Sequence, residues 1–197
     1  MGNRRRVFVH PSHPGLCIKI ARHQHIRRGL DRRGGLYRLM PTRWRDDNWL
    51  EARAYQQTAL RDDASPNWQY VPRLHGWQPT DIGDGLVFDY YRTPQGAPAP
   101  SLEALLQSGP CSADLERALA DLEKYLADTN LWMRPPGPAN IVWANDGRLK
   151  LIDCLGTYNM QLLRHLAPIR KRRRNRHIRY LNGAVARLQQ APPLVAE

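Results

Sequence analysis

The chain has 197 residues, of which 42% are hydrophobic and 24% charged, so it can bury the core of one domain and does not read as a disordered chain. It contains no apolar run of about 18 residues, which excludes a transmembrane helix of ordinary length. Its three cysteines are scattered singly, which excludes a disulfide framework and a Cys-x-x-Cys zinc site and predicts a reduced, cytoplasmic protein.

The net charge of +12 is distributed unevenly along the chain. Residues 1–45 carry +11, residues 46–159 carry −7, and residues 160–197 carry +8. Basic ends around an acidic middle predict contact with a polyanion, either nucleic acid or an acidic protein. The same pattern is equally compatible with attraction between the ends and the middle of this one chain. The sequence leaves both interpretations open.

The first half of the chain alternates short apolar runs with turn residues. Residues 7–9 and 17–20 predict two strands, because both runs are rich in β-branched or aromatic residues. Residues 21–45, rich in arginine and glycine, predict an irregular basic insert. Residues 46–60 predict a helix with acids in its first turn. Two further strands are expected at residues 70–71 and 85–91.

Capping residues mark the helices of the second half. Ser101 and Ser112 each precede residues with helical apolar spacing, and the second of these helices is expected to run to Asp128. Residues 141–152 predict a hairpin around an Asn-Asp-Gly turn, and residues 161–188 predict a basic helix. This order of elements predicts a single α+β domain over residues 1–197 and not an alternating wound sheet.

Four side chains are placed where their chemistry could act together. Lys19 lies in an apolar strand, and a buried ammonium needs a partner, which Glu51 of the next helix could supply. Asn140 precedes one strand of the hairpin and Asp153 follows the other, so the two meet at its open end. Their amide and carboxylate oxygens are hard ligands that suit Mg²⁺. The alternative is that Lys19 and Glu51 are solvated and that the other two are ordinary turn residues.

These residues carry a resemblance to the protein-kinase-like fold and, more closely, to the YrbL family of PhoP regulatory network proteins. In kinases a strand lysine pairs with a helix glutamate, and a metal-binding Asn and Asp flank a hairpin. The resemblance covers nearly the whole chain. The resembling segments are residues 2–11, 17–20, 50–55, 71–76, 85–89, 138–142, 151–153 and 169–180.

The resemblance implies a role for each member of the set. Lys19 would hold the phosphates of ATP, Glu51 would orient Lys19, and Asn140 and Asp153 would hold Mg²⁺. The fold implied is a small, truncated kinase-like one, with an antiparallel N-lobe sheet and one helix, a reduced helical C-lobe and a basic C-terminal helix. Its parts would be residues 1–91, 92–159 and 160–197, with the hinge between the lobes near residues 86–91.

Departures from the kinase pattern bear on activity. The position of the catalytic-base aspartate, five residues before Asn140, is held by Pro135, which has no side-chain base. The Gly-rich loop is reduced to Gly2 at the start of the sequence, so either the loop frays or translation begins upstream. The sequence therefore predicts a nucleotide-binding regulatory protein with a degenerate kinase site. The alternatives are an active small phosphotransferase with a base from Asp128 or Asp146, and a non-enzymatic basic protein that binds polyanions.

Overall fold

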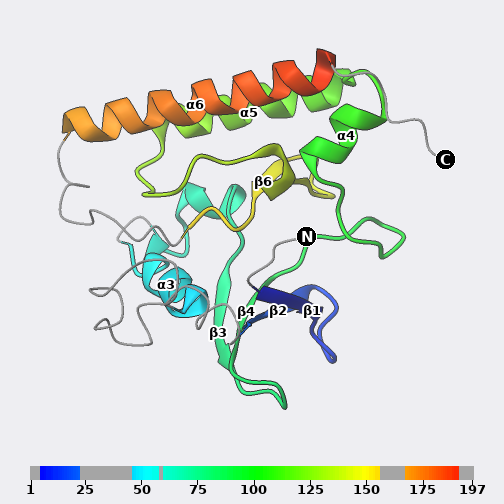
Figure 1. Cartoon of the computed structure of the whole chain (residues 1–197), viewed down its shortest axis with the longest axis vertical. Coiled ribbons are helices and arrows are strands. Elements are labelled where there is room, and N and C mark those ends of the chain that lie inside the picture. Colours follow the sequence, from blue (N-terminus) through cyan, green and yellow to red (C-terminus); the bar gives the residue numbers. More distant parts are fainter. Residues whose placement is uncertain (1–4, 23–45, 58–59, 156–166, 191–197) are drawn as a thin grey trace, which may run out of the picture.

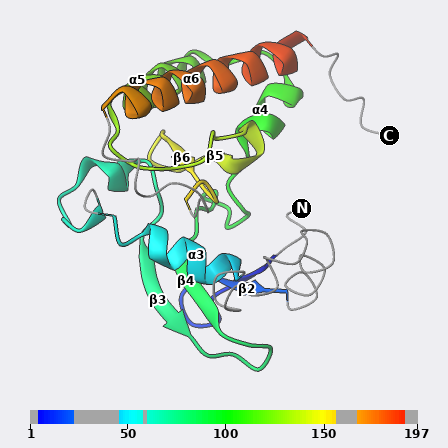
Figure 2. The ribbon, with the colours of Figure 1, turned by 60° about the vertical axis from the view of Figure 1, so that its left-hand side comes forward.

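The computed structural model describes residues 5–22, 46–57, 60–155 and 167–190. Among these residues, a sheet and one helix lie at one end, three helices lie at the other, and a short hairpin lies between them (Figures 1 and 2). The predicted α+β class is confirmed, whereas the division of the chain at residues 91 and 159 stays a prediction. The strands, helices and 3₁₀-helices (η) are β1 (Arg5–Val9), β2 (Leu16–Ala21), α3 (Asp47–Ala54), η3 (Pro66–Gln69), β3 (Leu74–Gln78), β4 (Gly85–Asp89), α4 (Leu102–Ser108), α5 (Ala113–Asp128), η4 (Pro138–Asn140), β5 (Ile141–Trp143), β6 (Leu149–Leu151) and α6 (Ala167–Gln190).

The main sheet has the order β1-β2-β4-β3, and every neighbouring pair is antiparallel. The predicted antiparallel sheet is thus confirmed. Val7 of β1 is opposite Lys19 of β2, and Lys19 is opposite Leu86 of β4. Directly opposed residues of an antiparallel pair share a face, and side chains alternate along each strand. Lys19 therefore shares one sheet face with Cys17 and with Arg5 at the start of β1.

Helix α3 is shorter than predicted. It begins after Asp46, whose side chain accepts a hydrogen bond from the backbone N–H of Asn48, but it ends at Ala54 and not at residue 60. Gln57 is buried beyond its end. Its side chain accepts from the backbone N–H of Trp132 at 2.7 Å and donates to the carbonyl of Trp132 at 3.2 Å. These tertiary contacts compete with further helical turns, which local propensity alone would allow.

The predicted strand at residues 70–71 is wrong. Tyr70 is the C-cap of the 3₁₀-helix η3, whose N-terminus Ser65 caps through its side chain, and the strand of this region is β3 further on. The carbonyl of Tyr70 nevertheless accepts a hydrogen bond from the backbone N–H of Leu151 at 2.6 Å, a single bond to β6 with no ladder. Strand β4 also ends at Asp89, two residues earlier than expected.

The helical end of the molecule follows the predicted caps. The side chains of Ser101 and Ser112 accept from backbone N–H groups in the first turns of α4 and α5, and α5 ends at Asp128 as predicted. The hairpin of β5 and β6 is also confirmed. The predicted C-terminal helix corresponds to α6, while its first expected residues, 161–166, and residues 23–45 of the basic insert lie outside the described residues. No helix of the described ranges combines the length and apolar character needed to cross a bilayer.

Helix α6 packs against α4, α5 and η4 through a face that includes a buried histidine. His177 is 2% exposed, and neither ring nitrogen makes a hydrogen bond of good geometry with the described residues. Arg173, one turn earlier, stacks at 3.7 Å on the ring of Trp132 and donates from Nε to the carbonyl of Met133 at 3.0 Å. Burial, with added repulsion from Arg173 and Arg176, lowers the pKa of His177 to about 4.

We expect this histidine to make folding sensitive to mild acid. The unfolded chain binds a proton near pH 6.5, whereas folded His177 stays neutral down to about pH 4, so stability falls as the pH drops through that interval. The loss between pH 7 and pH 5 is expected to be about 2 kcal/mol. Urea denaturation at the two pH values measures it. His177→Leu should remove most of the difference, and the exposed His13→Gln should leave it intact; a difference unchanged in His177→Leu would contradict the assignment.

Candidate functional site

Four charged side chains from four separate parts of the chain form one closed cluster. Lys19 Nζ lies 3.3 Å from Glu51 Oε1 and 2.5 Å from Asp153 Oδ1. Arg5 Nη2 lies 2.9 Å from the same Asp153 oxygen, and Arg5 Nη1 pairs with Glu51 Oε2. The predicted ion pair between Lys19 and Glu51 is confirmed. Each carboxylate binds both cations, so the charges of the cluster balance.

Neighbouring elements fix the lysine and the glutamate in place. Helix α3 presents Glu51 toward the sheet, and its Asn48 donates from Nδ2 to the backbone carbonyl of Lys19 at 2.8 Å. Lys19 Nζ also lies 4.4 Å from the ring centre of Phe88 on β4, a distance typical of a cation–π contact. The side chains of Lys19 and Glu51 are only 7% and 2% exposed. Lys19 and Glu51 therefore form a desolvated ion pair. Removing one partner of such a pair is strongly destabilising, because it leaves the other charge buried without a counter-charge.

Asp153 reaches the cluster through a left-handed backbone. It follows β6, and its φ of 52° is uncommon for any residue except glycine, although aspartate is among the more tolerant. The backbone N–H of Ile152 donates to the carbonyl of Asn140 at 2.8 Å, which fixes the open end of the hairpin. Arg134 Nη2 donates to the Asp153 backbone carbonyl at 3.0 Å. The carboxylate is 36% exposed, so it is the member of the cluster that solvent reaches most.

The neighbouring charges shift the pKa values of Asp153 and Lys19. Burial alone would raise the pKa of Asp153, but Lys19 and Arg5 outweigh it and hold that pKa below its usual range. Burial alone would lower the pKa of Lys19, but Glu51 and Asp153 raise it instead. Both groups are therefore charged at neutral pH. The Cys154 thiol, next in the chain, has its pKa raised to about 12, mainly by burial, so it is not an activated thiolate.

The predicted metal ligands are brought together in part. Asn140 and Asp153 lie at the same end of the hairpin, and the Asn140 residue is exposed. One oxygen of Asp153 already binds two cations, and within the described residues no three His, Cys, Asp or Glu side chains form a metal-binding group. This donor set does not form a complete metal cage. It fits Mg²⁺ that arrives with phosphate oxygens and keeps several waters.

Apolar side chains border the cluster on β1. Val7 and Val9 are 54% and 45% exposed, and the register places them opposite Lys19 and Cys17. They therefore share a sheet face with the charged cluster. The exposed valines form an apolar surface next to the buried charges. Such a surface suits a flat organic group, such as a nucleobase, that is attached to an anion.

Arg5 is the member of the cluster that the sequence analysis missed. It stands in a run of three arginines before the strand predicted at residues 7–9, and such a run is normally solvated. A signal was nevertheless present, because period-two alternation puts Arg5 on the same face as Val7 and hence as Lys19, while Arg6 points to the other face. The contact with Asp153, 148 positions away in the sequence, could not be obtained from that pattern.

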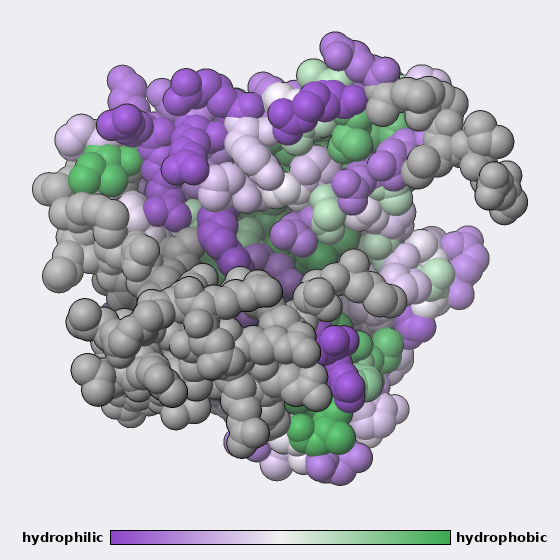
Figure 3. Space-filling view, viewed as in Figure 1, coloured by the Kyte–Doolittle hydropathy of each residue, from purple (hydrophilic) through white to green (hydrophobic). Residues whose placement is uncertain are grey.

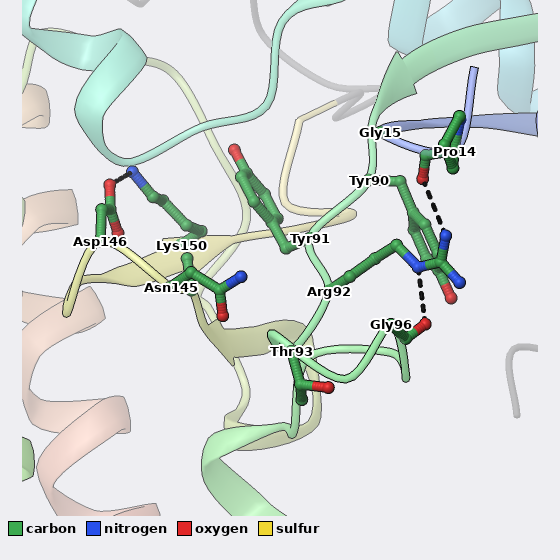
Figure 4. Close-up of a pocket in the computed structure, with 11 residues that line it drawn as sticks. Pro14, Gly15, Tyr90, Tyr91, Arg92, Thr93, Gly96, Asn145, Asp146 and Lys150 are labelled. Carbon is green, nitrogen blue, oxygen red and sulfur yellow. Dashed lines mark hydrogen bonds and ion pairs between the residues drawn. The ribbon is translucent and has the colours of Figure 1, made fainter.

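A separate pocket of about 470 Å³ lies at the turn end of the hairpin (Figure 4). Residues 90–93, which include part of the predicted hinge, form one wall. Lys150 pairs there with Asp146 at 2.6 Å, and Arg92 donates from Nε to the Gly96 carbonyl at 2.7 Å. The β5–β6 ladder separates Asp146 from the end that holds Asn140. Asp146 is thus badly placed to replace a base missing at residue 135.

Comparison with known proteins adds the family. The protein-family model described as "PhoP regulatory network protein YrbL" matches residues 1–185. Proteins described as "Uncharacterized protein YrbL" from Escherichia coli (strain K12) and from Shigella flexneri are each 27% identical over 144 residues. The match covers 72% of this chain and 60% of each relative's length. The match to the family model spans most of the chain and includes the whole charged cluster, so the chain belongs to the YrbL family of PhoP regulatory network proteins.

Proposed function

We propose that this chain is a cytoplasmic, nucleotide-binding regulatory protein with a truncated kinase-like fold and a site that does not transfer phosphate. The observation that carries the proposal is the position of Lys19, held between Glu51 of α3 and Asp153 at the end of the hairpin. A strand lysine, a helix glutamate and an aspartate after a hairpin are the groups by which kinases hold Mg-ATP.

The surroundings of Lys19 support a nucleotide over a smaller anion. The α- and β-phosphates would meet Lys19, while the base would lie along Val7 and Val9. Asp153 and Asn140 would hold Mg²⁺ through the phosphates, and the metal would offset the charge of the triphosphate. Without such a counter-charge, a polyanion would meet two carboxylates as well as two cations.

The lack of a side-chain base at residue 135 argues against phosphate transfer. A positioned general base contributes about 10²–10⁴-fold to proton abstraction, and Pro135 has no group to supply it. Asp146 lies at the opposite end of the hairpin and is paired with Lys150. We therefore favour binding without turnover over the alternative of an active small phosphotransferase.

Titration with Mg-ATP tests this proposal. Lys19→Met should weaken binding about tenfold or more, because a charge-assisted contact to phosphate is lost. Asp153→Asn should make the affinity insensitive to Mg²⁺. Lys150→Met is the matched control, since Lys150 is an equally buried lysine paired with a carboxylate at the other end of the hairpin. Circular dichroism of each variant checks that it is folded.

Three outcomes would contradict the proposal. Equal weakening by Lys19→Met and Lys150→Met would show that the effect is not local to the site. Undetectable binding of ATP by the folded wild-type protein would exclude it as a nucleotide site. Transfer of the γ-phosphate at about 1–100 s⁻¹, lost in Asp153→Asn, would show an active kinase with a base outside residue 135.

A second candidate function rests on α6. Arg172, Arg176 and Arg179 are exposed, and their spacing places them on one face of the helix, away from buried Leu181. None of the three forms an ion pair with an acid of the described residues, although the middle of the chain is acidic. Figure 3 shows hydrophilic side chains gathered over the first half of α6. We infer that this face binds a nucleic acid, since arginine recognises phosphate in a bidentate manner.

A further inference from the structure

Arg5 is built into the site in a way that a phosphate-binding residue alone would not require. Its side chain is only 11% exposed and reaches both carboxylates, Nη1 to Glu51 and Nη2 to Asp153 at 2.9 Å. It thereby satisfies the same two groups that Lys19 satisfies. The free protein thus keeps its two carboxylates neutralised by its own side chains.

The contact between Arg5 and Asp153 affects whether Asp153 can bind a metal. Arg5 and Lys19 both approach Oδ1, and no hydrogen bond from the described residues reaches Oδ2. A divalent cation that approached this carboxylate would meet two positive charges within a few ångströms. Like charges at that distance are expected to weaken the binding of a cation by a factor of about ten or more. Asp153 is therefore a poor metal ligand while both cations are in place.

Of the two cations, Arg5 is the one that can be withdrawn. Lys19 lies in β2, between β1 and β4, and Asn48 of α3 binds its backbone carbonyl. Arg5 is the first residue of β1, which lies at the edge of the sheet and has β2 as its one ladder partner among the described strands. Movement at the start of an edge strand breaks few hydrogen bonds, whereas movement of a central strand breaks the sheet.

We infer that Arg5 is an internal counter-ion of Asp153 that excludes a divalent cation from the free site, so that metal enters only when an anionic ligand draws Arg5 away. This inference rests on the proposed function, because the anionic ligand is the nucleotide triphosphate. It adds a regulatory step to the site, in which metal and nucleotide bind together and the metal alone binds poorly.

Binding of Mn²⁺ alone, followed by water-proton relaxation at constant ionic strength, tests the inference without any nucleotide. Arg5→Gln should bind Mn²⁺ about tenfold more tightly than the wild-type protein. Arg6→Gln is the matched control, because Arg6 is the next residue, is exposed and points to the opposite sheet face. Arg5→Gln combined with Asp153→Asn should lose the gain, which would locate the metal at Asp153.

An unchanged or weaker Mn²⁺ affinity in folded Arg5→Gln would overturn the inference, and so would an equal gain in Arg6→Gln. Arg5→Lys serves if the glutamine variant does not fold, since lysine keeps the charge but lacks the fork that spans both carboxylates, and a partial gain is expected. The nucleotide proposal fails on different evidence. If no variant binds Mg-ATP but Arg5→Gln gains Mn²⁺ affinity, Arg5 still excludes metal and the nucleotide assignment is wrong.

Discussion

Replacing Glu51 with alanine is expected to lower the free energy of unfolding by about 3–5 kcal/mol, because it leaves Lys19 and Arg5 buried with one carboxylate between them. The Glu51 side chain is 2% exposed, so water cannot replace the ion pairs that its carboxylate makes with Lys19 and Arg5. Such a loss is a large share of the stability of an ordinary domain. Urea denaturation at neutral pH measures it.

A surface glutamate and a paired replacement serve as controls. Glu123→Ala, on a half-exposed position of α5, should change stability by less than about 1 kcal/mol. Lys19→Met combined with Glu51→Leu should cost less than Glu51→Ala alone, since removing both charges leaves Arg5 paired with Asp153 and no buried lysine unmatched. If Glu51→Ala lowered the free energy of unfolding by less than about 1 kcal/mol, the prediction would be wrong. The cluster would then be hydrated, and its charges would not carry the cost of burial.

The central pair of this cluster was predicted mainly from the resemblance to kinases. An isolated lysine in an apolar strand suggested a counter-charge, and Glu51 lies in the next helix, but the sequence alone left open that both side chains are solvated. The hairpin placed Asp153 and Asn140 at one end, because short strands around an Asn-Asp-Gly turn allow few registers. The contact between Asp153 and Lys19 depends on the positive φ of Asp153. A positive φ at this position could not be predicted from the spacing of residues.

The errors in the predicted fold arose where tertiary contacts outweighed local pattern. Helix α3 was extended too far because apolar residues continue at helical spacing to Ala59, but the Gln57 side chain is bound to the backbone of Trp132, a partner 75 positions away. Strand β3 was missed because its sequence, Leu-His-Gly-Trp-Gln, lacks a clear apolar alternation. Its pairing with β4 fixes it instead. Capped helices were predicted well, since caps are local hydrogen bonds.

Replacing Arg172, Arg176 and Arg179 of α6 with glutamine is expected to weaken single-stranded RNA binding about tenfold or more at low salt, with no loss of stability. Each phosphate contact contributes about 0.7 to the slope of log affinity against log salt concentration, so the slope should fall by up to about 2. The three side chains are exposed and form no ion pair with a described acid. Fluorescence anisotropy of a labelled RNA across a salt series measures both quantities.

Arg173 is the matched contrast within the same basic run. It stacks on Trp132 and donates to the Met133 carbonyl, so Arg173→Gln should lower the free energy of unfolding by about 2 kcal/mol and change the RNA slope little. The two variants thus separate an outward face that binds phosphate from an inward arginine that holds α6 in place. Lost stability in the triple variant would contradict the outward face. Affinity for anionic lipid vesicles without affinity for RNA would show that the face meets a membrane surface and not a nucleic acid.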